Sequence, residues 1–138
     1  MKKTNNKGFS LVELIVVIAI MAVLVGVVAP TFLRYVEDAR RAKDIQAAAA
    51  LQTAYLADIA DGTIDTNVDD PAEVTDTSRP STYGETPEIS GRLAAVTNFY
   101  YTCDVVNGVV TIFGGSSADT DAFTLSSEDG AEAYKDAE

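Results

Sequence analysis

The feature that most constrains this chain is an uncharged, apolar run near its amino terminus. Sixteen residues, Leu14 to Ala29, carry no charge, and a single carboxylate, Glu13, stands directly before them. If residues 9–33 form a helix, that helix is about 37 Å long, enough to cross a bilayer with some tilt. A charged group in hydrocarbon costs roughly 2.5–3.5 kcal/mol on insertion scales, so Glu13 is expected to have a partner.

Charge is divided unevenly along the chain. Residues 1–43 carry seven basic and three acidic side chains, whereas residues 44–138 carry three basic and eighteen acidic ones. Three lysines precede the apolar run, so the positive-inside rule places the first residues in the cytoplasm. The acidic remainder argues against direct binding of nucleic acid.

The composition excludes most catalytic chemistry. The 138 residues include no histidine, no tryptophan and one cysteine, Cys103, which cannot close an intrachain disulfide. No nucleophile–base pair and no metal cluster can be recognised in the sequence, so we expect a protein that is not an enzyme.

Three interpretations of the amino-terminal segment are open. A secretory signal peptide would be cut after Ala29, but Pro30 follows directly and is a poor context for cleavage. An ordinary membrane anchor would use Ser10 and Glu13 as a capping box, in which the carboxylate reaches back to the amide of the cap residue. The third interpretation uses the whole string around Glu13.

That string resembles the prepilin signature of type IV pilins and type II secretion pseudopilins: Lys7-Gly8-Phe9-Ser10-Leu11-Val12-Glu13-Leu14-Ile15. The shared features are a short basic leader, a glycine before the cut, a phenylalanine after it, and a glutamate ahead of a long apolar helix that contains a proline. The resemblance covers roughly residues 1–60 and is most specific at residues 7–15.

The resemblance implies a route to a filament. A membrane prepilin peptidase would cut between Gly8 and Phe9, releasing leader residues 1–8, and Phe9 would be N-methylated. An inner-membrane assembly platform with a cytoplasmic ATPase would then draw the chain out of the cytoplasmic membrane. The product would be a homopolymeric pilus at the cell surface that serves adhesion, motility or DNA uptake. Glu13 of one subunit would pair with the Phe9 amine of a neighbour, a buried ion pair that sets registry.

Gly26 and Pro30 lie inside the helix that the resemblance implies. Proline removes one helical hydrogen bond and clashes with the preceding turn, so a kink or a locally melted stretch is expected there. Filament packing would unwind this region according to the resemblance. A proline tolerated within an intact membrane helix is the alternative.

The sequence as a whole predicts an α+β, pilin-like fold, with a long helix packed against a small antiparallel β-sheet. The helix should extend from Phe9 to about Ala60 and stop at Asp61-Gly62, its assembly half being residues 9–33 and its amphipathic half residues 34–61. Residues 62–138 would form a globular head with a loop and a β-meander.

Two faces are predicted for the amphipathic half. One is an apolar stripe that packs on the head, formed by Phe32, Val36, Ala39, Ile45, Ala48, Ala49, Tyr55, Leu56 and Ile59. The other is a charged face, either solvated or available for salt bridges between subunits, formed by Arg34, Glu37, Asp38, Arg40, Arg41, Lys43 and Asp44.

Within the head, two β-rich runs on either side of Asn107-Gly108 predict a hairpin with a type I′ turn. A third strand is expected at residues 122–126, short helical turns at residues 71–74 and 90–96, and a frayed end at residues 128–138. Cys103 is expected to be buried. Phe99, Tyr100 and Tyr101 are expected in the core, with an adhesive patch as the alternative.

A cation-binding loop would distinguish the two branches of the resemblance. Asp119, Asp121 and Asp129 are candidates for calcium, which major pseudopilins bind late in the chain, but the full calcium-loop pattern is absent and solvated carboxylates are the simpler interpretation. The first expectation is a pilus subunit, and the alternative is a pseudopilin of a secretion or competence system. A membrane-anchored binding domain that never polymerises is the second alternative.

Overall fold

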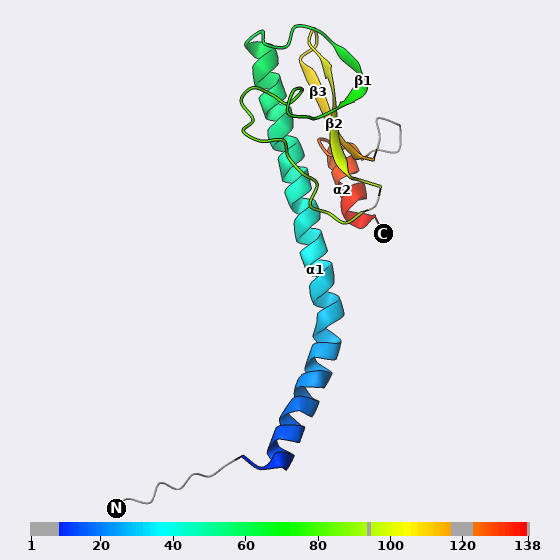
Figure 1. Cartoon of the computed structure of the whole chain (residues 1–138). Helices are drawn as coiled ribbons and strands as arrows, with labels where there is room; N and C mark the ends of the chain where they lie inside the picture. Colours follow the sequence, from blue (N-terminus) through cyan, green and yellow to red (C-terminus); the bar gives the residue numbers. More distant parts are fainter. Residues whose placement is uncertain (1–8, 94, 117–122, 138) are drawn as a thin grey trace, which may run out of the picture. The chain divides into compact units, whose positions relative to one another are not determined.

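The computed structural model describes residues 9–93, 95–116 and 123–137 (Figure 1). Along the chain it contains helix α1 (Leu11–Ala60), strands β1 (Val68–Glu73), β2 (Asn98–Asp104) and β3 (Val109–Gly115), and helix α2 (Glu128–Asp136). A long amino-terminal helix and a small antiparallel sheet confirm the expected α+β class. The chain divides into two compact units between Val36 and Glu37.

The first unit is helical from Leu11 and apolar on every side. Its large apolar side chains from Leu11 to Leu33 have exposed fractions between 48% and 72%, so this helix buries no stripe of its own. The helix is long and apolar enough to cross a membrane. It continues through Gly26 and Pro30, so the helix is not broken at these positions in the single chain. The unwinding expected on assembly stays a prediction.

In the second unit, α1 buries one narrow stripe. Its buried residues follow one another at intervals of three and four: Arg41, Asp44, Ala48, Leu51, Tyr55 and Asp58. This spacing places all six side chains on one face of the helix. The helix ends where the sequence predicted, because Gly62 adopts φ +75° and its amide donates to the Ile59 carbonyl.

The buried stripe corrects the predicted one. Ala48 and Tyr55 are buried as expected and Ile45 and Ile59 are half-buried, but Phe32, Ala39, Ala49 and Leu56 are exposed. The prediction that Arg41 and Asp44 lie on a solvated face was wrong. Hydrophobic periodicity does not identify charged residues that find backbone partners inside the fold.

The sheet has the order β1-β2-β3 and is antiparallel throughout. Strand β1 replaces the short helix predicted at residues 71–74. Pro71 is tolerated because β1 is an edge strand whose pairing with β2 is irregular between Val68 and Ala72. No helix forms at the described residues between Ser90 and Val96.

The predicted hairpin is confirmed, but its turn is of a different kind. Asp104 pairs with Val109, so four residues connect β2 and β3 instead of two. A type I′ turn needs positive φ at both of its central residues. Gly108 has φ +64°, but no residue other than glycine has a positive φ in the described chain, so Asn107 does not meet this requirement. The Asp104 carboxylate accepts hydrogen bonds from Asn107 N at 3.0 Å and from Asn107 Nδ2 at 2.5 Å, which holds the longer loop.

The carboxyl-terminal region was predicted to fray and instead forms α2. Ser127 caps this helix by accepting a hydrogen bond from Gly130 N, and Ala131 and Tyr134 are buried. The third strand expected at residues 122–126 is reduced, within the described part, to one bridge between Gly114 and Phe123. The polar composition of this segment gave no sign of a packed helix, because only two residues one turn apart, Ala131 and Tyr134, are buried.

The core lies where the sheet, α1 and α2 meet. Phe99, Tyr101 and Cys103 of β2 pack in one cluster with Leu51 and Tyr55 of α1. The rings of Tyr55 and Tyr101 are stacked, with centroids 4.3 Å apart. Tyr100 is also buried, so the core interpretation of the three aromatic residues is confirmed.

Candidate functional site

The first candidate site is the amino-terminal end of α1. The amide of Ser10 donates a hydrogen bond to Glu13 Oε2 at 2.8 Å, which is the contact predicted for a capping box. The Leu14 amide donates to the Ser10 carbonyl at 3.2 Å and begins the helical ladder. Glu13 therefore has a local partner in the single chain and lies at the positive end of the helix dipole.

Phe9 and Glu13 are accessible in the single chain. Phe9 is 90% exposed, and Gly8, the other residue of the predicted cleavage bond, lies outside the described residues. An ionised carboxylate has two oxygens and about four acceptor positions, so the Ser10 amide leaves capacity for a further donor. This end of the helix can accept a second, cationic partner at Glu13.

The calcium site expected at Asp119, Asp121 and Asp129 stays a prediction. Asp129 lies in the first turn of α2 and is exposed, where it suits the positive end of the helix dipole. Asp119 and Asp121 lie outside the described residues. Elsewhere in the described chain no three potential metal ligands come together.

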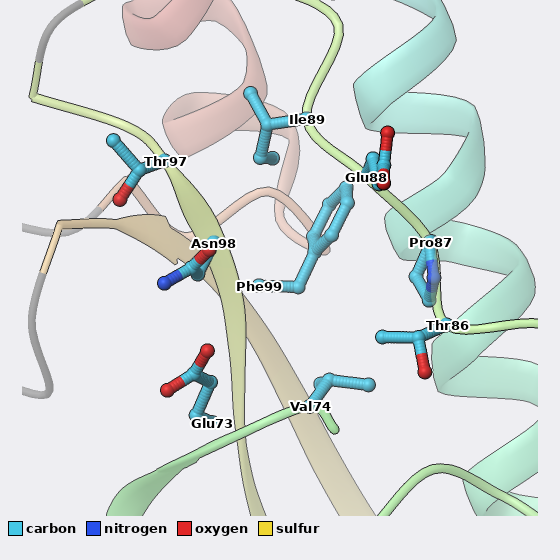
Figure 2. Close-up of a pocket in the computed structure, with 9 residues that line it drawn as sticks. All are labelled: Glu73, Val74, Thr86, Pro87, Glu88, Ile89, Thr97, Asn98 and Phe99. Carbon is cyan, nitrogen blue, oxygen red and sulfur yellow. The ribbon is translucent and has the colours of Figure 1, made fainter. Parts of the chain in front are cut away.

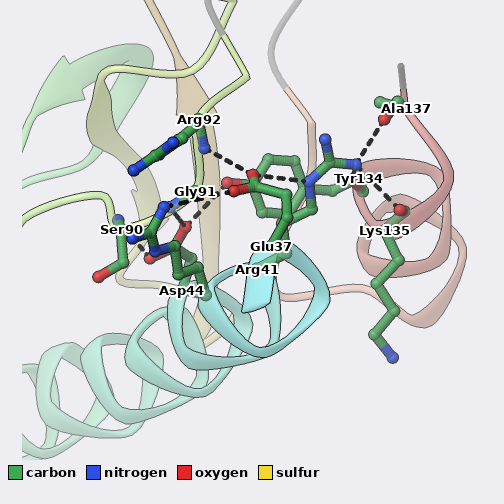
Figure 3. Close-up of polar contacts among 10 residues, drawn as sticks. Glu37, Arg41, Asp44, Ser90, Gly91, Arg92, Tyr134, Lys135 and Ala137 are labelled. Carbon is green, nitrogen blue, oxygen red and sulfur yellow. Dashed lines mark hydrogen bonds and ion pairs between the residues drawn. The ribbon is translucent and has the colours of Figure 1, made fainter. Parts of the chain in front are cut away.

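The second candidate site is a polar network in the head that sequence reasoning missed (Figure 3). Its centre is Asp44, which is 1% exposed. The Asp44 carboxylate accepts hydrogen bonds from the amides of Ser90 and Gly91 at 2.7 and 2.8 Å. It also accepts one from the Tyr134 hydroxyl at 2.8 Å. One carboxylate of α1 thus holds both the segment before β2 and helix α2.

Arg41 closes the same junction by capping the end of α2. Its guanidinium donates to the carbonyls of Tyr134 and Lys135 at 3.1 and 3.0 Å, and also to the carbonyl of Ala137. The last carbonyls of a helix have no partners within the helix and carry partial negative charge, so a buried cation suits them. The guanidinium carbon also lies 5.7 Å from the centre of the Tyr134 ring.

Glu37 completes the network toward solvent. Its Oε1 accepts from Arg92 N at 2.6 Å and from Arg41 Nε at 3.2 Å. Partial burial acts to raise the pKa of Glu37, but the Arg92 amide and the nearby guanidinium groups outweigh it and hold the pKa below its usual 4.5. Burial and the hydrogen bond to Asp44 raise the pKa of Tyr134 above its usual 10.0.

Gly91 is required by the close packing of this junction. A Cβ atom at this position would overlap the Tyr134 hydroxyl oxygen and lie 3.0 Å from Asp44 Oδ2. The backbone therefore approaches Asp44 at a distance that only glycine permits.

A second contact of the same kind lies four helical turns further along α1. Asp58 is 2% exposed and accepts from the amide and hydroxyl of Ser81 at 2.6 and 2.8 Å. The Tyr55 hydroxyl donates to the Ser78 carbonyl at 2.9 Å. The long connection between β1 and β2 is thus tied to α1 at both ends, which explains how an irregular segment keeps one conformation.

A signal for the missed network exists in the sequence. Arg41, Asp44 and Asp58 share the three–four spacing of Ala48, Leu51 and Tyr55, so they belong to the buried stripe by position. Arg41 and Asp44 were predicted on the opposite face only because they are charged. The groups that form hydrogen bonds with them in the fold lie 46 to 96 positions away in the sequence.

Comparisons with known proteins give a family match and a curated relative. Residues 3–29 match the family described as the prokaryotic N-terminal methylation motif. The chain is 41% identical over 68 residues to prepilin peptidase-dependent protein A of Clostridium perfringens (strain 13 / type A), a match covering 49% of this chain and 48% of that protein. The chain therefore matches about half the length of this curated relative. No solved structure matches the chain.

Proposed function

Since the chain carries a prepilin-type amino-terminal segment, we propose that it is the structural subunit of a type IV pilus-like filament. The observation that carries the proposal is the methylation motif at residues 3–29, joined to an apolar helix whose side chains are exposed on every side. Such a surface is stable in water only when lipid or other protein chains cover it. The membrane covers it before assembly, and neighbouring copies cover it afterwards.

Processing is proposed to begin at the cytoplasmic face of the membrane. A prepilin peptidase cuts between Gly8 and Phe9, which removes three of the basic side chains that hold the amino terminus inside. Glycine before the cut lets the backbone enter a narrow cleft because it has no side chain. The new amine of Phe9 is then methylated.

Assembly is proposed to use Glu13 as the registry residue. In the single chain its carboxylate accepts one hydrogen bond from the Ser10 amide, and its remaining acceptor positions are suited to the Phe9 amine of a neighbouring copy. Two opposite charges that meet in an apolar bundle are strongly favoured over either charge alone, so the pair selects one register. An assembly platform and an ATPase supply the work of extraction.

A pseudopilin of a secretion or competence system would share all of these steps and form a short, envelope-bound filament. Immunogold electron microscopy of intact and sheared cells with antibody to the head separates the two proposals. Labelled fibres microns long support a pilus subunit, whereas label confined to the envelope supports a pseudopilin.

The test of processing is the intact mass of the chain isolated from native membranes. The expected mass is that of residues 9–138 plus one methyl group. A variant with a bulky residue before the cut, Gly8→Leu, should keep the full precursor mass, and Gly26→Leu serves as the control with the same change inside the helix. An uncut wild-type chain would contradict the proposal and favour a membrane-anchored domain that does not polymerise.

A further inference from the structure

The two ends of strand β2 differ in what they expose to solvent. The start of β2 borders a pocket of about 380 Å³ (Figure 2), but Phe99, which lines it, is 1% exposed and is already packed in the core. The end of β2 leads into the loop between Asp104 and Val109, in which residues 106–108 are all exposed. The reactive groups of this loop are therefore in contact with water.

The loop contains the pair Asn107-Gly108. In such a pair the peptide nitrogen of the glycine can attack the carbonyl carbon of the asparagine side chain, because the ring that forms has five members and glycine has no side chain to obstruct it. The other asparagines of the described chain, Asn67 and Asn98, precede a valine and a phenylalanine, whose side chains crowd the nitrogen. The sequence therefore favours this reaction at Asn107.

The structure of the loop leaves the reacting atoms of this pair free. The Gly108 amide makes no hydrogen bond within the described part of the chain. Asn107 Nδ2 donates to Asp104 Oδ2 at 2.5 Å, so the contact is made by the nitrogen that would leave and not by the carbonyl carbon. Gly108 has φ +64° in an exposed turn, where the backbone is little restrained.

Two aspartate–glycine pairs, at residues 61–62 and 129–130, provide a comparison within the chain. The Gly62 amide donates to the Ile59 carbonyl at 3.1 Å, and the Gly130 amide donates to Ser127 Oγ at 3.2 Å. A peptide nitrogen held in such a hydrogen bond at the end of a helix does not turn toward the preceding side chain. Of these three pairs, the one at residues 107–108 has the free glycine nitrogen.

We propose that Asn107 is a site of spontaneous deamidation, which converts it to aspartate and isoaspartate. Hydroxide removes the proton of the Gly108 amide, the nitrogen forms a bond to Asn107 Cγ, and the Cγ–Nδ2 bond breaks. The leaving nitrogen takes a proton from water and departs as ammonia. A second water molecule then opens the cyclic imide at either of its carbonyls. The proposal is independent of whether the chain forms a filament.

Deamidation would change the loop that joins β2 to β3. The donor that Asp104 binds at 2.5 Å is replaced by a carboxylate oxygen, and two carboxylates in contact repel each other. Isoaspartate also adds one methylene group to the main chain. The new charge lies between Val106 and Val109, which are 87% and 53% exposed, so an apolar loop becomes anionic. The loop should therefore open irreversibly as the protein ages.

The site is tested on the full chain in detergent micelles, kept at mildly alkaline pH and sampled over days. Peptide mapping by mass spectrometry should find the loss of one NH and the gain of one oxygen at residue 107, in two isomeric forms. Asn107→Gln keeps the amide, but its ring would have six members. Conversion at this position should be about tenfold slower, which corresponds to a barrier raised by about 1.4 kcal/mol.

Asn98→Gln is the matched control and should leave the rate at residue 107 unchanged. An Asn107 that stays unmodified would overturn the proposal. So would isoaspartate that forms at residue 61 or 129 before it forms at residue 107.

Two further variants test the effect on the hairpin. Asn107→Asp introduces the second carboxylate directly and should speed the amide hydrogen exchange of Val109 and Val110 several-fold. Asp104→Asn combined with Asn107→Asp leaves one carboxylate and should return the exchange toward that of the wild type. The exchange of Leu51 in the core reports whether each variant keeps its fold. Equal exchange in Asn107→Asp and the wild type would overturn the proposed opening of the loop.

Discussion

The hydroxyl of Tyr134 in α2 donates a hydrogen bond of 2.8 Å to the carboxylate of Asp44 in α1, although 90 positions separate the two residues in the sequence. Both residues are fully or almost fully buried, at 0% and 1% exposure. The same carboxylate holds the amides of Ser90 and Gly91. This contact joins α1, the segment before β2 and α2, and it closes the head without a disulfide.

Removal of the Tyr134 hydroxyl should destabilise the head. Tyr134→Phe keeps the ring and deletes one hydrogen bond to a charged acceptor, so we expect a loss of about 1.5–3 kcal/mol in the free energy of unfolding. Tyr83→Phe, at a half-buried tyrosine outside this network, is the control and should change stability much less. Urea unfolding of the full chain in detergent, followed by near-ultraviolet circular dichroism, measures both. Equal stability of Tyr134→Phe and the wild type would show that the contact is energetically neutral.

Arg41 should be needed as a guanidinium and not merely as a positive charge. Arg41→Lys leaves an ammonium that cannot donate in several fixed directions to Glu37 and to the three carbonyls at the end of α2. We expect faster amide hydrogen exchange in α2, with smaller changes in the β2–β3 hairpin. Arg40→Lys, at a partly exposed residue 3.8 Å from Glu37, is the matched control. Unchanged exchange in α2 of Arg41→Lys would contradict the capping role.

Gly91→Ala should destabilise the head because the new methyl group overlaps the Tyr134 hydroxyl and crowds Asp44. Overpacking of this kind costs about 1–3 kcal/mol. Gly84→Ala is the control, since a Cβ there meets nothing within 4 Å. That substitution should be neutral or slightly stabilising because alanine restricts the unfolded chain. The measurement is the midpoint of thermal unfolding of Gly91→Ala and of Gly84→Ala in the same detergent. Similar midpoints for the two variants would show that the packing around Gly91 can expand to accept the methyl group.

The head should lose stability as the pH rises above about 10, the usual pKa of tyrosine. Burial raises the pKa of Tyr55, and burial together with Asp44 raises the pKa of Tyr134, so the folded chain keeps protons that the unfolded chain releases. Stability is therefore fully present below the unfolded pKa and is lost as the pH increases beyond it. In Tyr55→Phe the free energy of unfolding should decline less steeply between about pH 9 and about pH 11. An identical slope in the variant and the wild type would contradict this account. Lysine side chains titrate in the same pH range in the variant and in the wild type, so their contribution cancels when the two slopes are compared.

Glu13→Gln should be processed normally and assemble poorly. The amide side chain can still accept from Ser10, so the start of the helix is preserved, but it has no charge to pair with the Phe9 amine of a neighbour. Asp38→Asn changes an exposed carboxylate elsewhere on α1 and should assemble as the wild type does. Intact mass measures processing, and the yield of sheared filaments measures assembly. A normal filament yield from Glu13→Gln would eliminate the pairing mechanism.

Local sequence signals predicted those parts of the fold that depend on near neighbours. The start of α1 follows from Ser10 and Glu13, three residues apart, and its end follows from Gly62, which takes the left-handed conformation. The hairpin of β2 and β3 follows from two β-rich runs, although its turn is longer because Asp104 binds Asn107. In each case the residues that decide the structure lie within a few positions of one another.

Elements whose stability comes from distant partners were not predicted. Strand β1 is acidic and contains Pro71, and it forms because β2 offers it an edge. Helix α2 is polar by composition and forms because Tyr134 and the carbonyls that follow it reach Asp44 and Arg41. Neither partner is visible in a local window of sequence.

The sequence by itself determined the amino-terminal region of this protein: a basic start, a methylation-type motif, and a continuous apolar helix with Glu13 at its start. Only the tertiary structure decided which face of α1 the head covers. A buried charge is tolerated only when donors or acceptors surround it, and those of Arg41 and Asp44 come from segments far along the chain. A hydrophobic pattern can be recognised from residues that are close in the sequence, whereas the hydrogen-bond partners of a buried charge are known only once the whole chain has folded.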